Sequence, residues 1–199
     1  MDTDELTRRY IVLLTGWNRK INLVHCATLH NALKRHVQDS LQISQFLAKD
    51  DHIIDVGSGA GFPGVILAIH GYKDVTLCEK NHKKYTFLLA IKSSLGLELE
   101  VSNEDIYKMN VPREAFSKIV LVSRAFGELI KLLDVMQAVG ANCGIFHKGA
   151  QHLREIENAQ RRFSFKYDKQ SSVTNKDGVI LKIYEVRQKA KQGRDVNDS

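Results

Sequence analysis

The sequence predicts an α/β fold: a doubly wound, mostly parallel sheet of seven strands that closes with an antiparallel hairpin and follows a helical N-terminal extension. A buried strand pattern runs into a glycine-rich turn and then a helix between residues 53 and 69. Strand and helix patterns alternate from there to residue 163, which indicates parallel strands with right-handed crossovers. Two final strand patterns flank a turn at residues 175–178 and predict the hairpin.

The first fifty residues predict the helical extension. Apolar residues at helical spacing indicate a helix over residues 2–17 that ends near Gly16. Residues 18–24 predict a turn, and residues 28–47 predict one or two further helices. Because the last residues show no apolar periodicity, we expect them to be disordered. The expected parts are a helical extension of residues 1–50, a sheet domain of residues 51–188 and a disordered tail of residues 189–199.

The elements of the sheet domain follow from the apolar runs and the glycines. Residues 53–56 form the first strand and residues 57–61 the glycine turn, and Phe62 and Pro63 open the helix that follows. Gly96 is expected to stop a later helix. The other predicted strands are residues 74–79, 97–101, 118–123, 142–147, 163–169 and 179–187, and the other predicted helices are residues 81–95, 127–139 and 151–163.

Composition restricts the class of protein. The chain has 199 residues, of which 43% are hydrophobic and 26% charged, as in ordinary globular proteins, and its net charge of +6 favours a polyanionic partner. Cys26, Cys78 and Cys143 are far apart, which suggests no disulfide framework, and His25, Cys26 and His30 lack a fourth ligand, so we predict no metal site. Without a long apolar run or a signal-peptide pattern, a cytoplasmic protein that does not enter a membrane is expected.

The glycine-rich turn predicts a cofactor that carries adenosine without a pyrophosphate. Gly57, Gly59 and Gly61 allow a ligand to lie on the backbone. Their GxGxG spacing departs from the dinucleotide fingerprint, because Phe62 stands at the position of its third glycine. Asp55 precedes the turn and no basic residue lies in it, which suits a cation better than a pyrophosphate. These features favour S-adenosylmethionine over NAD.

Carboxylates follow the next two strands. Glu79 ends the second strand, where it can accept hydrogen bonds from both ribose hydroxyls. Glu104 and Asp105 follow the third strand, where the adenine edge would lie. Asp105 also suits the N-cap of a turn at residues 106–107, and the two roles are compatible. The glycine turn, Asp55, Glu79 and the closing hairpin together predict a methyltransferase.

The end of the fourth strand, LVSRAFG, predicts the acceptor side with Ser123 and Arg124. Neither the proline-containing motif of amine methylation nor a cysteine for base C5 methylation stands there. A ring nitrogen such as guanine N7 needs proximity and alignment more than a general base. Arg124 can hold the cofactor or the acceptor through its planar fork of donors; alternatively, it pairs with Glu79 or Asp55.

Five motifs occur in order along residues 17–149: WNRKINLV, RHVQDSL, DVGSGAGFPG, VSRAFG and FHKG. Through them the chain resembles the small-subunit rRNA guanine-N7 methyltransferases of the RsmG (GidB) type. The resemblance implies a Rossmann-like class I methyltransferase fold and S-adenosylmethionine as the cofactor. It also implies that the acceptor is N7 of one guanine in a loop near the decoding region of 16S rRNA.

The resemblance also assigns residues. It places cofactor contacts on Gly57, Phe62, Glu104, Asp105 and Arg124. The motif residues His36, Asp39 and Ser40 would border the cleft. This chain departs from many relatives at Ile66, where they carry a proline, and at Glu104, where they carry a small residue. We predict that Arg124, Ser123 and His36 act by positioning.

The expected partner is 16S rRNA or the small ribosomal subunit, bound by a monomer. Because no separate RNA-binding domain exists, phosphate contacts must come from cations around the cleft, and binding should depend strongly on salt. The predicted RNA-binding residues are Arg19, Lys20, Lys34, Arg35, His36 and Lys148. Solvated helix faces are the favoured interpretation of Lys80, Lys83, Lys84, Arg161 and Arg162. Phe62 and Phe126 are candidates for stacking on the target base. The alternatives are an NAD-linked oxidoreductase and a noncatalytic RNA-binding module.

Overall fold

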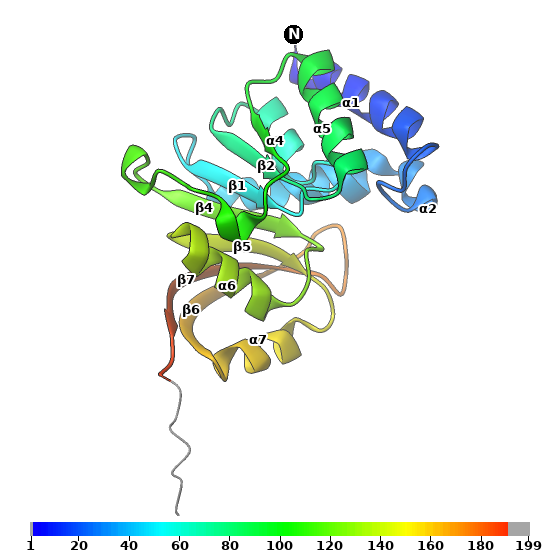
Figure 1. Ribbon diagram of the computed structural model, residues 1–199. Coiled ribbons are helices and arrows are strands. Elements are labelled where there is room, and N and C mark those ends of the chain that lie inside the picture. Colours follow the sequence, from blue (N-terminus) through cyan, green and yellow to red (C-terminus); the bar gives the residue numbers. More distant parts are fainter. Residues whose placement is uncertain (1, 191–199) are drawn as a thin grey trace, which may run out of the picture.

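The computed structural model describes residues 2–190 and contains one seven-stranded sheet in the order β3-β2-β1-β4-β5-β7-β6 (Figure 1). The first five strands are parallel, and β7 runs antiparallel to both β5 and β6. The predicted fold class is thus confirmed. The strands are β1 (His52–Val56), β2 (Val75–Cys78), β3 (Glu100–Ser102), β4 (Ile119–Arg124), β5 (Cys143–Lys148), β6 (Phe163–Ser171) and β7 (Val179–Gln188).

Helices cover both faces of the sheet, and the alternation of side chains along β1 shows why. Ile53 packs in the core on one face, whereas Ile54 packs in the core on the other. Both side chains are fully buried, so the sheet needs a helical layer on each side. One layer holds α1 (Thr3–Asn18), α4 (Gly64–Ile69) and α5 (His82–Leu95), and the other holds α6 (Leu129–Val139) and α7 (His152–Gln160) (Figure 1).

The chain between α1 and β1 is helical but irregular. It comprises α2 (Cys26–Leu29), a π-helical turn (Leu33–Gln38), α3 (Asp39–Leu41) and a 3₁₀ turn (Gln42–Phe46), so the prediction of one or two further helices over residues 28–47 is confirmed, although their hydrogen-bond pattern is irregular. Side-chain bonds compete with the regular backbone pattern there, because the Ser40 hydroxyl donates to the His36 carbonyl at 2.6 Å. The fully buried Tyr10 and Leu14 of α1 pack in the same core as the sheet.

The third strand is shorter and later than the prediction of residues 97–101. Gly96 ends α5 in the left-handed conformation at φ 61°, and the Leu97 N–H turns back to the Lys92 carbonyl. Leu97 and Leu99 are buried without pairing to β2, and pairing begins only at Glu100. The apolar residues that gave the strand pattern therefore lie in the segment that connects α5 to β3, where they pack in the core without pairing.

Two helix ends also differ from the prediction. α1 passes through Gly16 and ends at Asn18, whose Oδ1 accepts hydrogen bonds from the Leu23 and Val24 N–H groups at 2.9 Å each. α4 begins at Gly64 instead of Phe62. The remaining predicted strands and helices agree with the structure to within a few residues.

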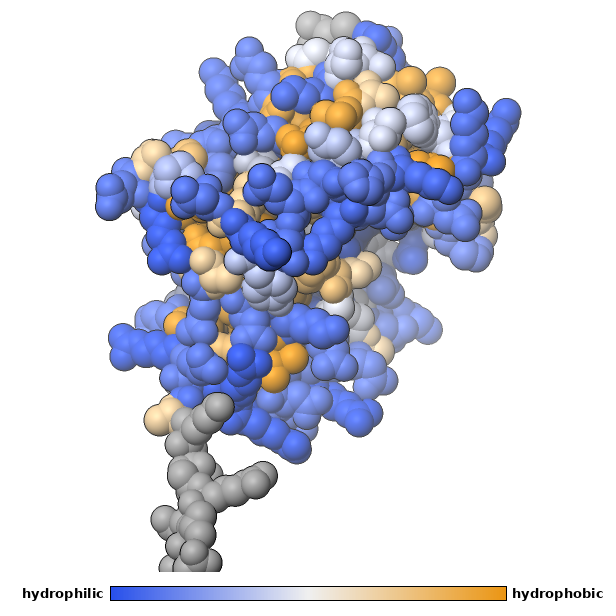
Figure 2. All heavy atoms as spheres, viewed as in Figure 1, coloured by the Kyte–Doolittle hydropathy of each residue, from blue (hydrophilic) through white to orange (hydrophobic). Residues whose placement is uncertain are grey.

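The surface in this view is mostly hydrophilic, with apolar side chains in separate patches (Figure 2). None of the helices in residues 2–190 combines the length and the apolar character that a bilayer crossing requires. Most of the predicted disordered tail, residues 191–199, lies outside the described residues.

Candidate active site

The glycine turn has the backbone conformation that its sequence predicts. Gly57, Gly59 and Gly61 take φ values of 67°, 56° and 90°, which side chains other than glycine rarely adopt. The Gly57 and Ser58 N–H groups donate to the Cys78 carbonyl at 2.9 and 3.1 Å, so the turn is tied to the end of β2. A Cβ added at Gly57 would lie 2.4 Å from Cδ2 of Phe126, which is too close. A Cβ added at Gly59 would meet only the Gly57 carbonyl oxygen, at 3.7 Å.

A pocket of about 300 Å³ opens beside this turn, at the carboxyl ends of β1, β2 and β4. In this pocket Glu79 supplies hydrogen-bond acceptors, and Ile106 and Phe126 supply apolar surface. This combination suits the pocket to a nucleoside, which has polar hydroxyls and a flat apolar base. The residues present therefore fit the adenosine of S-adenosylmethionine, and we call this the cofactor pocket. It is lined by Val56, Gly57, Cys78, Glu79, Lys80, Glu104, Ile106, Tyr107, Ala125 and Phe126.

The predicted carboxylates take different positions around the cofactor pocket. Glu79 accepts hydrogen bonds from the Gly59 N–H at 2.9 Å and the Asn81 N–H at 2.8 Å, so it also fixes the turn. Glu104 is exposed at the pocket wall. Asp105 caps the 3₁₀ turn that follows it, as the alternative interpretation held, and pairs with Lys80 at 2.7 Å. The hydrogen bond and charge of Lys80 lower the pKa of Asp105.

Asp55 is fully buried beneath the turn and does not line the cofactor pocket. Its Oδ2 accepts a hydrogen bond from the Gly64 N–H at 3.0 Å and so caps the first residue of α4. Its Oδ1 has no partner among the described residues. Burial raises the pKa of Asp55 to about 7. The charge of Asp55 can thus act on a bound cation only through the field beneath the turn.

A second pocket, of about 260 Å³, lies at the ends of β4 and β5 and shares Ala125 with the cofactor pocket. We call it the acceptor pocket, because its shared wall places it next to a bound cofactor. Extension, sheet and hairpin all contribute to it. It is lined by Arg35, His36, Asp39, Arg124, Ala125, His147, Lys148, Gly149, Ser172, Thr174, Asn175, Gly178 and Val179.

Arg124 reaches the acceptor pocket from the end of β4. Its Nη1 donates to Asp39 Oδ2 at 3.3 Å and to the Arg35 carbonyl at 3.4 Å. Its guanidinium lies 4.5 Å from the ring centre of Phe62. Burial lowers the pKa of Arg124, and the charge of Asp39 opposes that shift. The ion-pair partner is thus Asp39, and not Glu79 or Asp55 as the alternative interpretation held.

His36 and Phe62 form the floor under this arginine. The His36 ring stacks on Phe62 with centroids 4.9 Å apart, and its Nε2 shares a 2.8 Å hydrogen bond with the Thr28 hydroxyl. Burial and the nearby Arg124 charge lower the pKa of His36 to about 4, so the ring is neutral at neutral pH. Phe62 is only 3% exposed, because Tyr10 covers its edge. It is therefore not available to stack on a target base.

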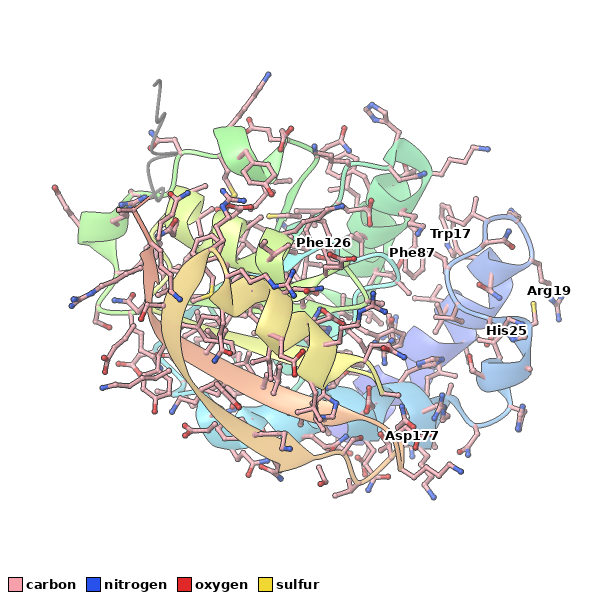
Figure 3. All side chains as sticks on the ribbon, turned by 90° about the horizontal axis from the view of Figure 1, so that it is seen from below. Trp17, Arg19, His25, Phe87, Phe126 and Asp177 are labelled. Atoms are coloured by element: carbon pink, nitrogen blue, oxygen red, sulfur yellow. The ribbon has the colours of Figure 1, made fainter. Side chains whose placement is uncertain are left out.

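Asp39 joins three parts of the chain at the acceptor pocket. Its carboxylate accepts hydrogen bonds from the hydroxyl of Thr174, in the β6–β7 loop, and from Gln42 Nε2. Its carbonyl pairs with His147 Nε2 at 2.9 Å. The loop that contains Asp177 accordingly lies beside the extension (Figure 3). Sequence reasoning missed Thr174, Gln42 and His147, and no pattern in the sequence pairs residues 39 and 174.

Two predicted residues direct their polar groups to other parts of the protein. The Ser123 hydroxyl donates to the Val56 carbonyl at 2.9 Å and is 1% exposed, so it joins β4 to β1. Lys148 borders the acceptor pocket, but its ammonium donates to Glu155 and to the Gly127 carbonyl, each at 2.6 Å. Neither side chain presents a free polar group to a substrate.

The other predicted RNA-binding cations are exposed in two places. Lys34 and Arg35 lie in the extension, and Arg35 lines the acceptor pocket. Arg19 and Lys20 follow α1, and Arg19 lies at the outer edge of the molecule, well away from Phe126 (Figure 3). The predicted cations therefore do not form one cluster.

Alanine at Gly57 is expected to reduce cofactor affinity by at least about 10-fold, because its Cβ would displace Phe126 in the pocket wall. Titration calorimetry with S-adenosylhomocysteine measures this. Gly96→Ala is the matched control, since Gly96 has nearly the same φ of 61° but open space around it. Equal affinities in the two variants would contradict the assigned pocket.

The sheet is mostly parallel and its last strand, β7, is antiparallel to β5. A glycine turn follows β1 and a carboxylate follows β2. Together these features define a class I S-adenosylmethionine-dependent methyltransferase. Comparison with known families identifies it further. The chain belongs to the GidB family, described as rRNA small subunit methyltransferase G, whose model matches residues 3–184. The family inferred from the five motifs is thereby confirmed.

Relatives and solved structures agree with this assignment. The ribosomal RNA small subunit methyltransferases G of Rickettsia prowazekii and Rickettsia bellii are each 35% identical over 173 residues, which cover 86% of this chain and 88% of theirs. The 16S rRNA methyltransferase RmtF with S-adenosyl-L-homocysteine shares the fold at a TM-score of 0.58 and 12% identity, covering 90% of this chain and 75% of that one. A SAM-dependent methyltransferase from Aquifex aeolicus shares the fold at a TM-score of 0.57 and 14% identity, and the match covers 77% of this chain and 92% of that one.

Proposed function

We propose that this chain transfers a methyl group from S-adenosylmethionine to N7 of a guanine in the decoding-region loop of 16S rRNA, acting as a monomer in the cytoplasm. The observation that carries the proposal is an acceptor pocket that adjoins the cofactor pocket at Ala125 and centres on an arginine. The names of the relatives support the rRNA substrate.

The residues around the two pockets suit this reaction. Bound S-adenosylmethionine supplies a methyl group activated by its sulfonium. Gly57, Glu79 and Phe126 would hold its adenosine, with Glu104 and Tyr107 at the rim. Asp55 stays beneath the turn, where its ionised form would attract the cofactor cation. Of the predicted cofactor residues, Gly57, Glu79 and Glu104 line the cofactor pocket and Asp55 lies beneath it, whereas the pocket lining does not include Gly59, Gly61, Phe62, Asp105 and Arg124.

Arg124 would orient the acceptor. The guanine edge that carries N7 also carries the acceptor O6, which an arginine can bind. N7 has an exposed lone pair and no proton to lose, so positioning is the main requirement. The neutral, stacked His36 would support the pocket floor without taking a proton.

The proposal is tested by mapping N7-methylguanine in 16S rRNA through reduction and strand cleavage, in cells with and without the gene for this chain. One cleavage in the decoding-region loop is expected to disappear on deletion and to return when the wild-type gene is restored. The gene carrying Arg124→Ala should fail to restore it. If every cleavage site persists after deletion, the rRNA assignment is wrong.

A further inference from the structure

A basic groove of about 370 Å³ lies between the turn that follows α1 and the start of α5. It belongs to neither pocket of the site. Three of its residues are lysines, contributed by segments sixty residues apart, and none of the six carries a carboxylate. It is lined by Lys20, Ile21, Asn22, Asn81, Lys83 and Lys84.

The two walls of this groove are held in place relative to each other. Asn18 Oδ1 accepts hydrogen bonds from the Leu23 and Val24 N–H groups, which fixes the turn that carries Lys20. The Trp17 ring packs edge-on against Phe87 of α5, with centroids 5.7 Å apart (Figure 3). The spacing between Lys20 and the lysines of α5 therefore does not depend on a flexible loop.

The charges in the groove are uncompensated by the protein. Lys20 and Lys83 are exposed and Lys84 is half-buried, and none of the three forms an ion pair with a carboxylate in residues 2–190. The neighbouring Lys80 differs, because it pairs with Asp105 at 2.7 Å. Three like charges around one concave surface create a local positive potential that an anionic partner would neutralise.

The groove also adjoins the cofactor pocket. Asn81 lines the groove, and its N–H donates to Glu79 of the pocket wall at 2.8 Å. Lys80, the residue between them, lines the cofactor pocket. A nucleic acid strand that extends from the cofactor pocket to the groove would place one nucleotide near the bound cofactor and the phosphates of the next nucleotides in the groove.

We propose that this basic groove binds backbone phosphates of the RNA substrate beside the cofactor pocket. Lys83 and Lys84 are then RNA contacts with Lys20, instead of the solvated helix face that sequence alone favoured. The identity of the RNA rests on the proposed function. The anionic character of the ligand rests on the groove itself.

The test compares the triple variant Lys20→Gln, Lys83→Gln, Lys84→Gln with a matched control, Arg154→Gln, Arg161→Gln, Arg187→Gln. The control removes three exposed cations from α7 and the end of β7, at the opposite end of the molecule from α5 (Figure 1). The probe is an unmethylated 16S rRNA transcript, whose dissociation constant is measured by filter binding from 50 to 200 mM KCl. Thermal unfolding and S-adenosylhomocysteine affinity show that each variant is folded.

The groove variant is expected to bind RNA about 10-fold more weakly at 100 mM salt, with a salt slope smaller by about 2. The control should keep the wild-type slope. Equal RNA affinity and slope in the two variants would overturn the inference. If the wild-type chain binds the transcript but never methylates rRNA, the proposed function is wrong. The salt slopes of the groove variant and the control variant still test whether the groove binds RNA.

Discussion

Replacing Arg124 by alanine is expected to lower the rate of methyl transfer by about 10²–10³-fold while cofactor affinity changes little. Arg124 lines the acceptor pocket and not the cofactor pocket, so its loss should affect the acceptor. Single-turnover transfer of a labelled methyl group to unmethylated small subunits measures the rate, and calorimetry with S-adenosylhomocysteine measures cofactor affinity.

Arg124→Lys separates charge from geometry. Lysine keeps a positive charge near Asp39 but lacks the planar fork that can bind the ion-pair partner and the acceptor together. Activity between that of alanine and wild type is therefore expected. Full activity in Arg124→Ala would remove the residue from the mechanism, and a large loss of cofactor affinity would move it to the cofactor pocket, as the family resemblance implied.

The fold and the cofactor pocket could be predicted because their signals are local. Positive φ at Gly57 and its neighbours follows from residue type and spacing, and Glu79 follows from its place at a strand end. The third strand was placed wrongly because Leu97 and Leu99 are apolar for packing and not for pairing. A single apolar run does not distinguish these two causes.

The acceptor pocket was only half predictable. Successive side chains on a strand point to opposite faces, so Ser123 and Arg124 were expected to differ in their surroundings. The strand pattern alone did not show which would reach the pocket, and the structure buries Ser123 against β1. The contact between Asp39 and Thr174 depends on how the last hairpin crosses the extension, which is set by tertiary packing and leaves no trace in local sequence.

Alanine at Asp39 is expected to produce the largest combined loss, about 3 kcal/mol of unfolding free energy together with most of the activity. Its carboxylate is 14% exposed and is the ion-pair partner of Arg124, so removal leaves a largely buried cation unpaired. The same substitution removes the hydrogen bonds that the Thr174 hydroxyl and the Gln42 amide donate to this carboxylate. Denaturant unfolding and the methyl-transfer rate measure the two losses.

Thr174→Val tests whether the hairpin acts on Arg124 through Asp39. Valine keeps the shape but removes the hydroxyl donor, so a loss of about 1 kcal/mol of unfolding free energy and a slower rate are expected. Thr174→Ser should restore both. In the Asp39→Ala background Thr174→Val should have a smaller effect, because the bond to Asp39 is already absent and only the hydroxyl contacts with Gln42 and Ser172 remain to be lost. Additive losses in the double variant would show that the loop and the ion pair are independent, and that Asp39 does not connect them.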